Sequence, residues 1–355
     1  MSVRITIKEI AEKAEVSIGT VSHVLNGTAK VREALRVRVL EAIRSLGYQP
    51  SELARGLRRN QTSMLAMMIP DVTNPFFPAV VRGVEDVAFK SSYRVVLCNT
   101  DNDRRKEILY LNSLRSYRPA GWLVIPSVDS EISSVFNLKA PRGTPVVCLD
   151  RQPQGWHGDV VLVANEAGAY SATRHLLRMG HRHLAVITGP LHLGNAVERL
   201  QGFKNALAEA EIPIDADYIQ EARFERNSGY NAAKRLLRML PRPTAIFACN
   251  DLMALGALVA ARELGLQCPE QLSLVGFDNL DFAEFTAPAL TTVHQPGYQL
   301  GTAAGRLLLD RIAGSEQPPQ KIVLPTELLI RNSVSPPSVG GFEGKDRLSE
   351  VVKVP

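Results

Sequence analysis

The chain has 355 residues, 45% of them hydrophobic and 6% aromatic, a normal composition for a globular protein but too long for one ordinary domain. No apolar run approaches the roughly 18 residues of a membrane span, and the charged N-terminus lacks the apolar core of a signal peptide, so we expect a cytoplasmic protein. The four cysteines, Cys98, Cys148, Cys249 and Cys268, have no metal-ligand spacing, so we expect reduced core residues, with neither a disulfide nor zinc.

The positive charge lies at one end of the sequence. Residues 1–60 contain 11 Lys and Arg against 6 Asp and Glu, a net charge of +5 that equals the formal net charge of the whole chain. The remaining residues carry 30 charges of each sign. This distribution predicts a polyanionic partner for the N-terminal part alone.

The N-terminal part has the pattern of three helices. Thr6 to Glu9 form a capping box before the first helix, and Ser17 is a candidate N-cap for a second helix that ends at Asn26-Gly27. A third helix is predicted from about Arg32 to Leu46, ending at Gly47. Two short helices joined by the tight turn at 15–17 indicate a helix-turn-helix, which the third helix supports.

A further short helix is predicted after Pro50 and Ser51, followed by a polar linker that ends at Ser63. At about nine residues, and with Gly56 inside it, this helix is too short to be stable alone. We expect it to form only against a partner surface.

From Met64 the pattern changes to short apolar runs that alternate with amphipathic helices. The runs are MLAMMIP, RVVLCNT, GWLVIP, PVVCLD, LAVITG, AIFACN and LSLVGFDN. This alternation predicts α/β structure with parallel sheets flanked by helices. The runs fall into two groups divided near Val163, which indicates two similar lobes.

Several motifs occur in order along the chain: TIKEIAEKAEVSIGTVSHVLNG, GYQPSELARGLR, IPDVTNPFF, CNDLMALGA, VGFDN and PALTTVHQP. Together they resemble the LacI family of bacterial transcription regulators over residues 5 to about 334. The resemblance implies an all-α helix-turn-helix domain (1–49), a hinge helix and linker (50–63), and a two-lobed domain like periplasmic sugar-binding proteins (64–334). It also implies three passages of the chain between the lobes, expected near Val163, Thr292 and Pro325. The first lobe then spans about 64–162 and 293–324, and the second about 163–292 and 325–334.

The resemblance implies that the second helix enters the major groove of operator DNA. Hydroxyl and amide groups suit phosphate oxygens, whereas Ile18 and His23 are the candidates for reading bases. His23 stands where relatives usually have Arg, and Gly19 offers no side chain, so the target sequence stays open. The expected DNA contacts in this domain are Thr6, Ser17, Ile18, Gly19, Thr20, Ser22, His23 and Asn26.

The short helix after Pro50 resembles the hinge helix of the family. Leu57 is then the apolar wedge inserted in the minor groove, with Ala54 beside it and Arg55 or Arg58 near phosphate. The alternative is a surface helix that merely links the domains.

The candidate effector site follows from strand ends, because ligands of open α/β sheets sit beyond the carboxyl ends of the strands. Polar or aromatic residues follow several apolar runs, and the resemblance assigns Phe76, Phe77 and Phe224 as walls with polar groups around them. The whole expected set is Asn74, Phe76, Phe77, Asp150, Arg151, Asn195, Arg199, Phe224, Asn250, Asp278 and Gln295. An apolar slot with a few fixed polar groups suits a small ligand such as a sugar or a related metabolite.

Some of these residues have structural alternatives. Phe76 or Phe77 could be ordinary core residues, Asp150 and Arg151 could form a loop ion pair, and Asp251 could cap a helix that begins at Leu252. Val197 is taken as the position where many relatives have a sugar-contacting Arg, which leaves a sugar derivative, a nucleoside or another metabolite open as effector.

An enzyme and a transport binding protein are the competing classes. The chain lacks a Walker loop, HExxH and GxSxG, its histidines are irregularly spaced, and no cofactor is implied. A solute-binding or sugar-processing protein with a nonspecific DNA-binding head remains the alternative to a regulator. We expect a homodimer on a pseudo-palindromic operator and, because residues after Asn332 lack a Leu heptad, no tetramer and a disordered tail over 335–355. The sequence does not decide whether the effector promotes or releases DNA binding.

Overall fold

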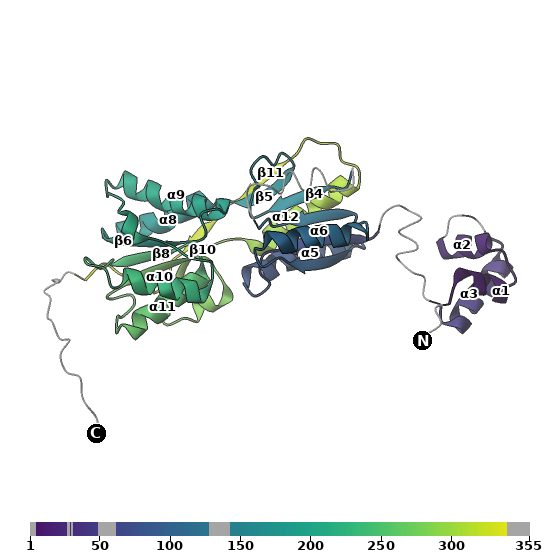
Figure 1. The fold of residues 1–355 in the computed structure, drawn as a ribbon, viewed down its shortest axis with the longest axis horizontal. Helices are drawn as coiled ribbons and strands as arrows, with labels where there is room; N and C mark the ends of the chain where they lie inside the picture. The colour runs from purple at the N-terminus through teal and green to yellow at the C-terminus, as the bar shows by residue number, and fades with distance from the viewer. Residues whose placement is uncertain (1–4, 27–28, 30, 49–61, 128–142, 339–355) are drawn as a thin grey trace, which may run out of the picture. The chain divides into compact units, whose positions relative to one another are not determined.

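A computed structural model describes residues 5–26, 29, 31–48, 62–127 and 143–338 (Figure 1). The chain divides into two compact units, Met1–Ser63 with Ser116–Pro119, and Met64–Arg115 with Ala120–Pro355. The predicted hinge helix and the tail from residue 339 onward lie outside the described residues.

The first unit contains the predicted helix-turn-helix. Its helices are α1 (Ile7–Lys13), α2 (Ile18–Asn26) and α3 (Glu33–Leu46). The Glu9 carboxylate accepts the Thr6 backbone N–H at 2.5 Å, and the Ser17 hydroxyl accepts the Thr20 N–H at 3.1 Å, so both predicted N-terminal caps are present. Gly47 ends α3 in the left-handed conformation, with φ of 63°. The three helices bury a small shared core: Ile10, Ala11, Ala14, Val21, Val39 and Ala42.

The second unit contains two six-stranded sheets, each flanked by helices. The first sheet has the order β11-β5-β4-β3-β1-β2, and the second β12-β10-β9-β8-β6-β7. All the pairings are parallel except that of β10 with β12. The strands are β1 (Met64–Ile69), β2 (Arg94–Asn99), β3 (Gly121–Val124), β4 (Val146–Leu149), β5 (Asp159–Val163), β6 (Leu184–Thr188), β7 (Ile219–Glu221), β8 (Ala245–Ala248), β9 (Ser273–Asp278), β10 (Thr291–His294), β11 (Lys321–Leu324) and β12 (Glu327–Leu329). The helices are α5 (Phe76–Lys90), α6 (Arg104–Arg115), α8 (Asn165–Arg178), α9 (Gly194–Glu209), α10 (Arg226–Leu236), α11 (Asp251–Glu263) and α12 (Gly297–Ile312), with short 3-10 turns η1 (Ala216–Tyr218) and η2 (Asp281–Glu284).

The chain passes three times between the lobes that these sheets form. The passages lie between β5 and α8, between β10 and α12, and between β11 and β12. The expected passage near Thr292 is displaced, because Thr292 still belongs to β10 and the chain leaves the second sheet at Gln295 and Pro296.

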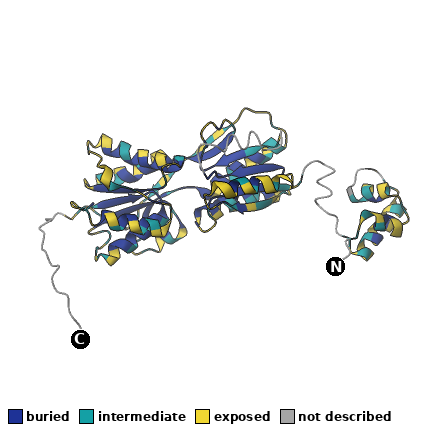
Figure 2. Cartoon of the chain, viewed as in Figure 1, coloured by how far each residue is buried: buried dark blue, intermediate teal, exposed yellow. Residues whose placement is uncertain are grey.

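The central strands are buried on both faces, whereas the helices turn an exposed face outward (Figure 2). Cys98, Cys148 and Cys249 are buried and Cys268 is half-buried, all as free thiols. The chain stays packed at Ser335, whose carbonyl accepts a hydrogen bond from His181 and whose N–H donates to the Ser273 hydroxyl at 3.0 Å. The disordered tail is predicted to start at residue 335, but Ser335 still packs on the second lobe. The predicted start is therefore too early.

Candidate functional site

The outer face of α2 presents the residues expected to contact DNA. Ser17, Ile18, Gly19 and His23 are exposed, and Val21 points into the core between them. Ile18 exposes 47% of its surface, which leaves its side chain available to a partner. Thr6 is also exposed, while Thr20 and Ser22 are half-buried. The Asn26 side chain and residues 54, 55, 57 and 58 lie outside what the structure describes.

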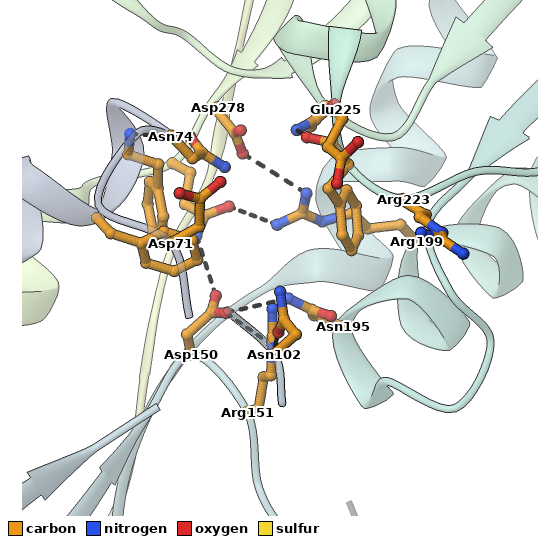
Figure 3. Close-up of a pocket in the computed structure, with 15 residues that line it drawn as sticks. Asp71, Asn74, Asn102, Asp150, Arg151, Asn195, Arg199, Arg223, Glu225 and Asp278 are labelled. Carbon is orange, nitrogen blue, oxygen red and sulfur yellow. Dashed lines mark hydrogen bonds and ion pairs between the residues drawn. The ribbon is translucent and has the colours of Figure 1, made fainter. Parts of the chain in front are cut away.

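One cavity of about 490 Å³, part of it open to solvent, lies between the two lobes (Figure 3). The structure brings all eleven expected effector-site residues together around it, and Asp71, Asn102, Arg223 and Glu225 complete its lining. That these residues bind a ligand stays a prediction.

Strand ends explain why residues so far apart in sequence meet here. Asp150 follows β4, Asn250 follows β8, Asp278 ends β9 and Gln295 follows β10. Because the strands are parallel, their carboxyl ends share one edge of each sheet, and the two edges face the same cavity. Helix α9 adds Asn195 and Arg199 from its first turns.

Arg199 is the best-connected side chain of the cavity. Its Nε donates to Asn165 Oδ1 at 2.9 Å, and its two terminal nitrogens donate to the Cys249 carbonyl and to Gln295 Oε1, each at 2.6 Å. The Asp278 carboxylate lies 3.5 Å from Nη1. The guanidinium also lies over the Phe277 ring, 3.8 Å from its centroid, in cation–π contact. The side chain is thus held on every edge of its plane.

Asp150 joins the two lobes directly. Its carboxylate accepts hydrogen bonds from Asn195 Nδ2 at 3.0 Å and Gln295 Nε2 at 3.3 Å, and Arg151 Nε lies 3.4 Å away. The ion pair foreseen as an alternative for Asp150 and Arg151 is therefore present inside the cavity wall. Asn195 Oδ1 is buried and accepts no hydrogen bond from any described residue, so one acceptor at the lobe junction is unused.

Burial raises the pKa of the Asp278 carboxyl group well above its usual value. The neighbouring Arg199 guanidinium opposes this effect, because it favours the carboxylate that pairs with it.

Four cavity residues adopt positive φ: Asn102 at 53°, Asp150 at 61°, Phe224 at 57° and Asp278 at 113°. For Phe224 this conformation is costly, and such strain concentrates at functional sites. Two neighbours stabilise the position. Asn250 Nδ2 donates to the Phe224 carbonyl at 3.0 Å, and Gly189 makes room for the ring, since a Cβ there would lie 2.1 Å from Phe224 Cζ.

Two sequence interpretations need correction. Helix α11 begins at Asp251, so its N-cap is Asn250, whose Oδ1 accepts the Met253 N–H; Asp251 is buried away from the cavity. Val197 exposes 46% of its surface outside the cavity, whereas Arg199 reaches into it, because the two positions face opposite sides of α9. The cavity therefore does contain a cationic side chain from this helix.

Phe76 and Phe77 are core residues that also line the cavity. Their rings pack edge to face at 5.3 Å between centroids, both belong to the core of the first lobe, and both line the cavity. Sequence reasoning missed Asn102, Arg223 and Glu225. Asn102 follows β2, so the strand-end rule applied to that run would have found it, whereas Arg223 and Glu225 follow the short edge strand β7.

Comparison with known proteins agrees with this architecture. A family model described as "Bacterial regulatory proteins, lacI family" matches residues 6–51, and one described as "Periplasmic binding protein-like domain" matches residues 173–334. An "HTH-type transcriptional repressor PurR" from Aliivibrio salmonicida is 38% identical over 329 residues, covering 93% of this chain and 98% of the relative. The PurR repressor of Proteus mirabilis is 40% identical over 332 residues, covering 93% of this chain and 97% of its own.

The chain belongs to the LacI family. It has the fold of that family: a helix-turn-helix region followed by an α/β domain with two sheets. Its function is that of a DNA-binding transcriptional regulator with a small-molecule effector, and not that of an enzyme.

Solved LacI-family structures are similar over most of this chain. The lac repressor dimer bound to operator and the anti-inducer ONPF has a TM-score of 0.82 at 25% identity, covering 94% of this chain and all of that one. A CelR–cellobiose complex has a TM-score of 0.71 at 32% identity, and the match covers 93% of this chain and 100% of the CelR chain. A ribose-bound regulator from Enterococcus faecium has a TM-score of 0.70 at 33% identity, covering 78% and 100%.

Two kinds of feature are absent from the described part of this LacI-family chain. None of its described helices is long and apolar enough to cross a membrane. Nor do three or more His, Cys, Asp or Glu side chains gather there in a way that could hold a metal ion.

Proposed function

We propose that this chain is a cytoplasmic repressor that binds a pseudo-palindromic operator as a homodimer, and whose operator affinity is set by a neutral, polyhydroxylated effector, a sugar or a related metabolite. Residues 1–49 read the operator, residues 50–63 form the hinge, and residues 64–334 bind the effector and dimerise. The DNA contacts are those expected on α2 and the hinge helix, and the effector contacts are the eleven cavity residues predicted from the sequence.

The pairing of buried charges carries the effector proposal. Arg199 is matched by Asp278 and Arg151 by Asp150, both within the cavity wall. An ionised ligand would have to separate these pairs or remain unpaired itself, and an unpaired buried charge is costly. A neutral ligand leaves both ion pairs intact and buries no unpaired charge.

The remaining groups favour hydroxyl groups on that ligand. Asn195 Oδ1 is an unused buried acceptor, and a ligand hydroxyl can donate to it while accepting from neighbouring amides. Phe76, Phe77 and Phe224 supply apolar walls against which the carbon face of a sugar ring packs. The CelR and E. faecium relatives were solved with cellobiose and ribose, which agrees with this class.

The relatives support the DNA side of the proposal. The PurR proteins are named repressors, and the lac repressor was solved as a dimer on its operator. Two-fold symmetry of a dimer calls for a two-fold pseudo-symmetric site.

The first experiment selects binding sites from a random DNA pool with the full chain and then measures the affinity for the selected site between about 50 and 200 mM salt. With about 6 to 10 phosphate contacts the affinity falls by roughly 10³ to 10⁵ over that range. An enriched pseudo-palindrome supports the proposal. If selection fails both alone and with metabolite pools, the N-terminal unit is a nonspecific binder.

The second experiment tests the effector class by calorimetric titration. D-ribose, cellobiose and other neutral sugars are compared with their phosphorylated forms. For a sugar that binds, Asn195→Ala should weaken binding at least about tenfold, since it removes hydrogen bonds in a buried site. Val197→Ala is the matched control on the exposed side of the same helix and should bind normally. Preference for the phosphorylated sugars contradicts the neutral class, and an effector that leaves operator affinity unchanged contradicts the coupling.

A further inference from the structure

Asn165 lies just behind the cavity, at the first passage between the lobes. It is the first residue of α8, two positions after the end of β5, and exposes only 1% of its surface. It does not line the effector cavity, and neither the sequence motifs nor the proposed effector contacts include it.

The Asn165 amide stands between a cation and an anion. Its Oδ1 accepts the Arg199 Nε–H at 2.9 Å, and its Nδ2 donates to Glu198 Oε2 at 2.9 Å. The orientation of the amide follows from chemistry, because a guanidinium can only donate and a carboxylate can only accept. An amide of this length satisfies both neighbours at once. Asp lacks the donor and would repel Glu198, while Ala and Leu lack both groups.

Arg199 is thereby tied to two of the three passages between the lobes. Its Nε is held by Asn165 at the β5–α8 passage, and its Nη2 by Gln295 at the β10–α12 passage. The remaining contacts, to the Cys249 carbonyl, the Asp278 carboxylate and the Phe277 ring, belong to the second lobe itself. A change in the angle between the lobes therefore bends the chain directly beside two of the acceptors that hold the guanidinium.

We propose that Asn165 is a positioning residue that fixes the Arg199 guanidinium in the effector cavity and links its orientation to the passage between the lobes. Glu198 holds the Asn165 amide in the orientation that Arg199 needs. The effector consequence rests on the proposed function, but the position of Arg199 can be tested without any effector.

The test uses crystal structures of the full-length, effector-free chain in four variants: Asn165→Ala, Asn165→Asp, Glu198→Gln and the double variant Asn165→Asp with Glu198→Gln. In Asn165→Ala the Arg199 guanidinium should leave its place over Phe277, since one edge has lost its acceptor. In Asn165→Asp it should also shift, because the new carboxylate turns away from Glu198. Glu198→Gln keeps an acceptor for Asn165 and should leave Arg199 in place.

The double variant separates positioning from a merely structural role. The carboxylate introduced at position 165 can accept from Arg199 while the amide introduced at position 198 donates to that carboxylate. The hydrogen bond from Arg199 to position 165 and the one between positions 165 and 198 are then both present. In the second of these, position 198 donates and position 165 accepts, the reverse of the parent chain. Of the two variants that carry Asn165→Asp, only this one should return the guanidinium to its native position. Thermal unfolding of each variant shows any loss of general stability separately.

The proposal is overturned if Arg199 keeps its contacts to Cys249 and Gln295 unchanged in Asn165→Ala, or if the double variant leaves Arg199 displaced as in Asn165→Asp. If Asn165→Ala does not fold, the comparison of Asn165→Asp with the double variant still decides. Failure of every sugar to bind would count against the proposed effector class and leave these structural outcomes unaffected.

Discussion

Asp251 is a single carboxyl group whose burial has a measurable consequence. It is fully buried, and its two oxygens accept the Leu280 N–H at 2.8 Å and the Thr292 hydroxyl at 2.6 Å. Burial raises the pKa of Asp251 from 3.8 to about 7 despite these hydrogen bonds. The folded chain therefore keeps this proton at pH values where the unfolded chain has released it.

We expect this group to destabilise the fold progressively as the pH rises from about 4 to about 7, by up to roughly 1.4 kcal/mol per pH unit. Asn is nearly isosteric and can satisfy both neighbours, because the Thr292 hydroxyl can turn to accept. Asp251→Asn should therefore flatten the decline of the unfolding free energy over this range, measured by urea denaturation. The exposed Asp103→Asn is the control and should follow the parent. Equal slopes for Asp251→Asn and the parent would show that Asp251 titrates normally.

At the residue scale the sequence predicts side chains that follow buried strands and misses those placed by loops. Asp150, Asn250, Asp278 and Gln295 could be foreseen because parallel strands deliver their ends to one edge. Arg223 and Glu225 could not, because β7 is too short to show an apolar run. Asn165 was equally hidden, since its role depends on contact with Arg199, thirty-four positions along the chain.

Two glycines of the helical unit should respond in opposite directions to substitution by Ala. Gly47 ends α3 with φ of 63°, so Gly47→Ala brings strain of about 1 kcal/mol although no atom lies within 4 Å of the new Cβ. Gly19 lies inside α2, where a Cβ would meet only the Ser17 hydroxyl at 3.5 Å, so Gly19→Ala should stabilise by about 0.5–1 kcal/mol.

Hydrogen exchange of the α1–α3 peptides in the full chain measures both effects. Faster exchange is expected in Gly47→Ala and slower exchange in Gly19→Ala. Gly19→Ala should in addition change affinity for the selected operator if α2 lies in the groove. Equal exchange in both variants would mean that backbone conformation does not limit the stability of this unit.

At the element scale, prediction succeeded where a strand shows a continuous apolar run. All seven apolar runs became strands, because the central positions of a doubly covered sheet require such sequence. The strands β5, β7, β10, β11 and β12 were not predicted. Of these, β7, β11 and β12 lie at sheet edges, and β11 alternates in exposure. The inner strands β5 and β10 contain polar residues that only the fold satisfies: Asp159 of β5 pairs with Arg311, and Thr292 of β10 donates to Asp251.

The assembly prediction concerns the whole chain. We expect sedimentation to give two chains per particle. A shortened chain that ends at Ser338 should also form a dimer and should bind the operator with unchanged affinity. The reason is that no Leu heptad follows Asn332 and that the packed contacts of Ser335 are retained in the shortened chain. A particle of four chains would contradict the predicted dimer. A monomer after truncation would place an assembly element in residues 339–355.

Hydrogen bonds across the junction of the two lobes favour one arrangement of the lobes. Asp150 of the first lobe is held by Asn195 of the second and by Gln295 of a passage, so these hydrogen bonds favour the closed cavity even without effector. Asp150→Ala removes both and should shift the effector-free population toward open lobes, seen as a larger radius of gyration in X-ray scattering. Glu107→Gln, a buried change in the first lobe that bridges no lobes, should scatter like the parent. Because an effector can shift this equilibrium only by the difference between its affinities for the two arrangements, Asp150→Ala should also reduce the effect of a bound effector on operator affinity. Unchanged scattering in Asp150→Ala would place the closing free energy elsewhere, in the passages themselves.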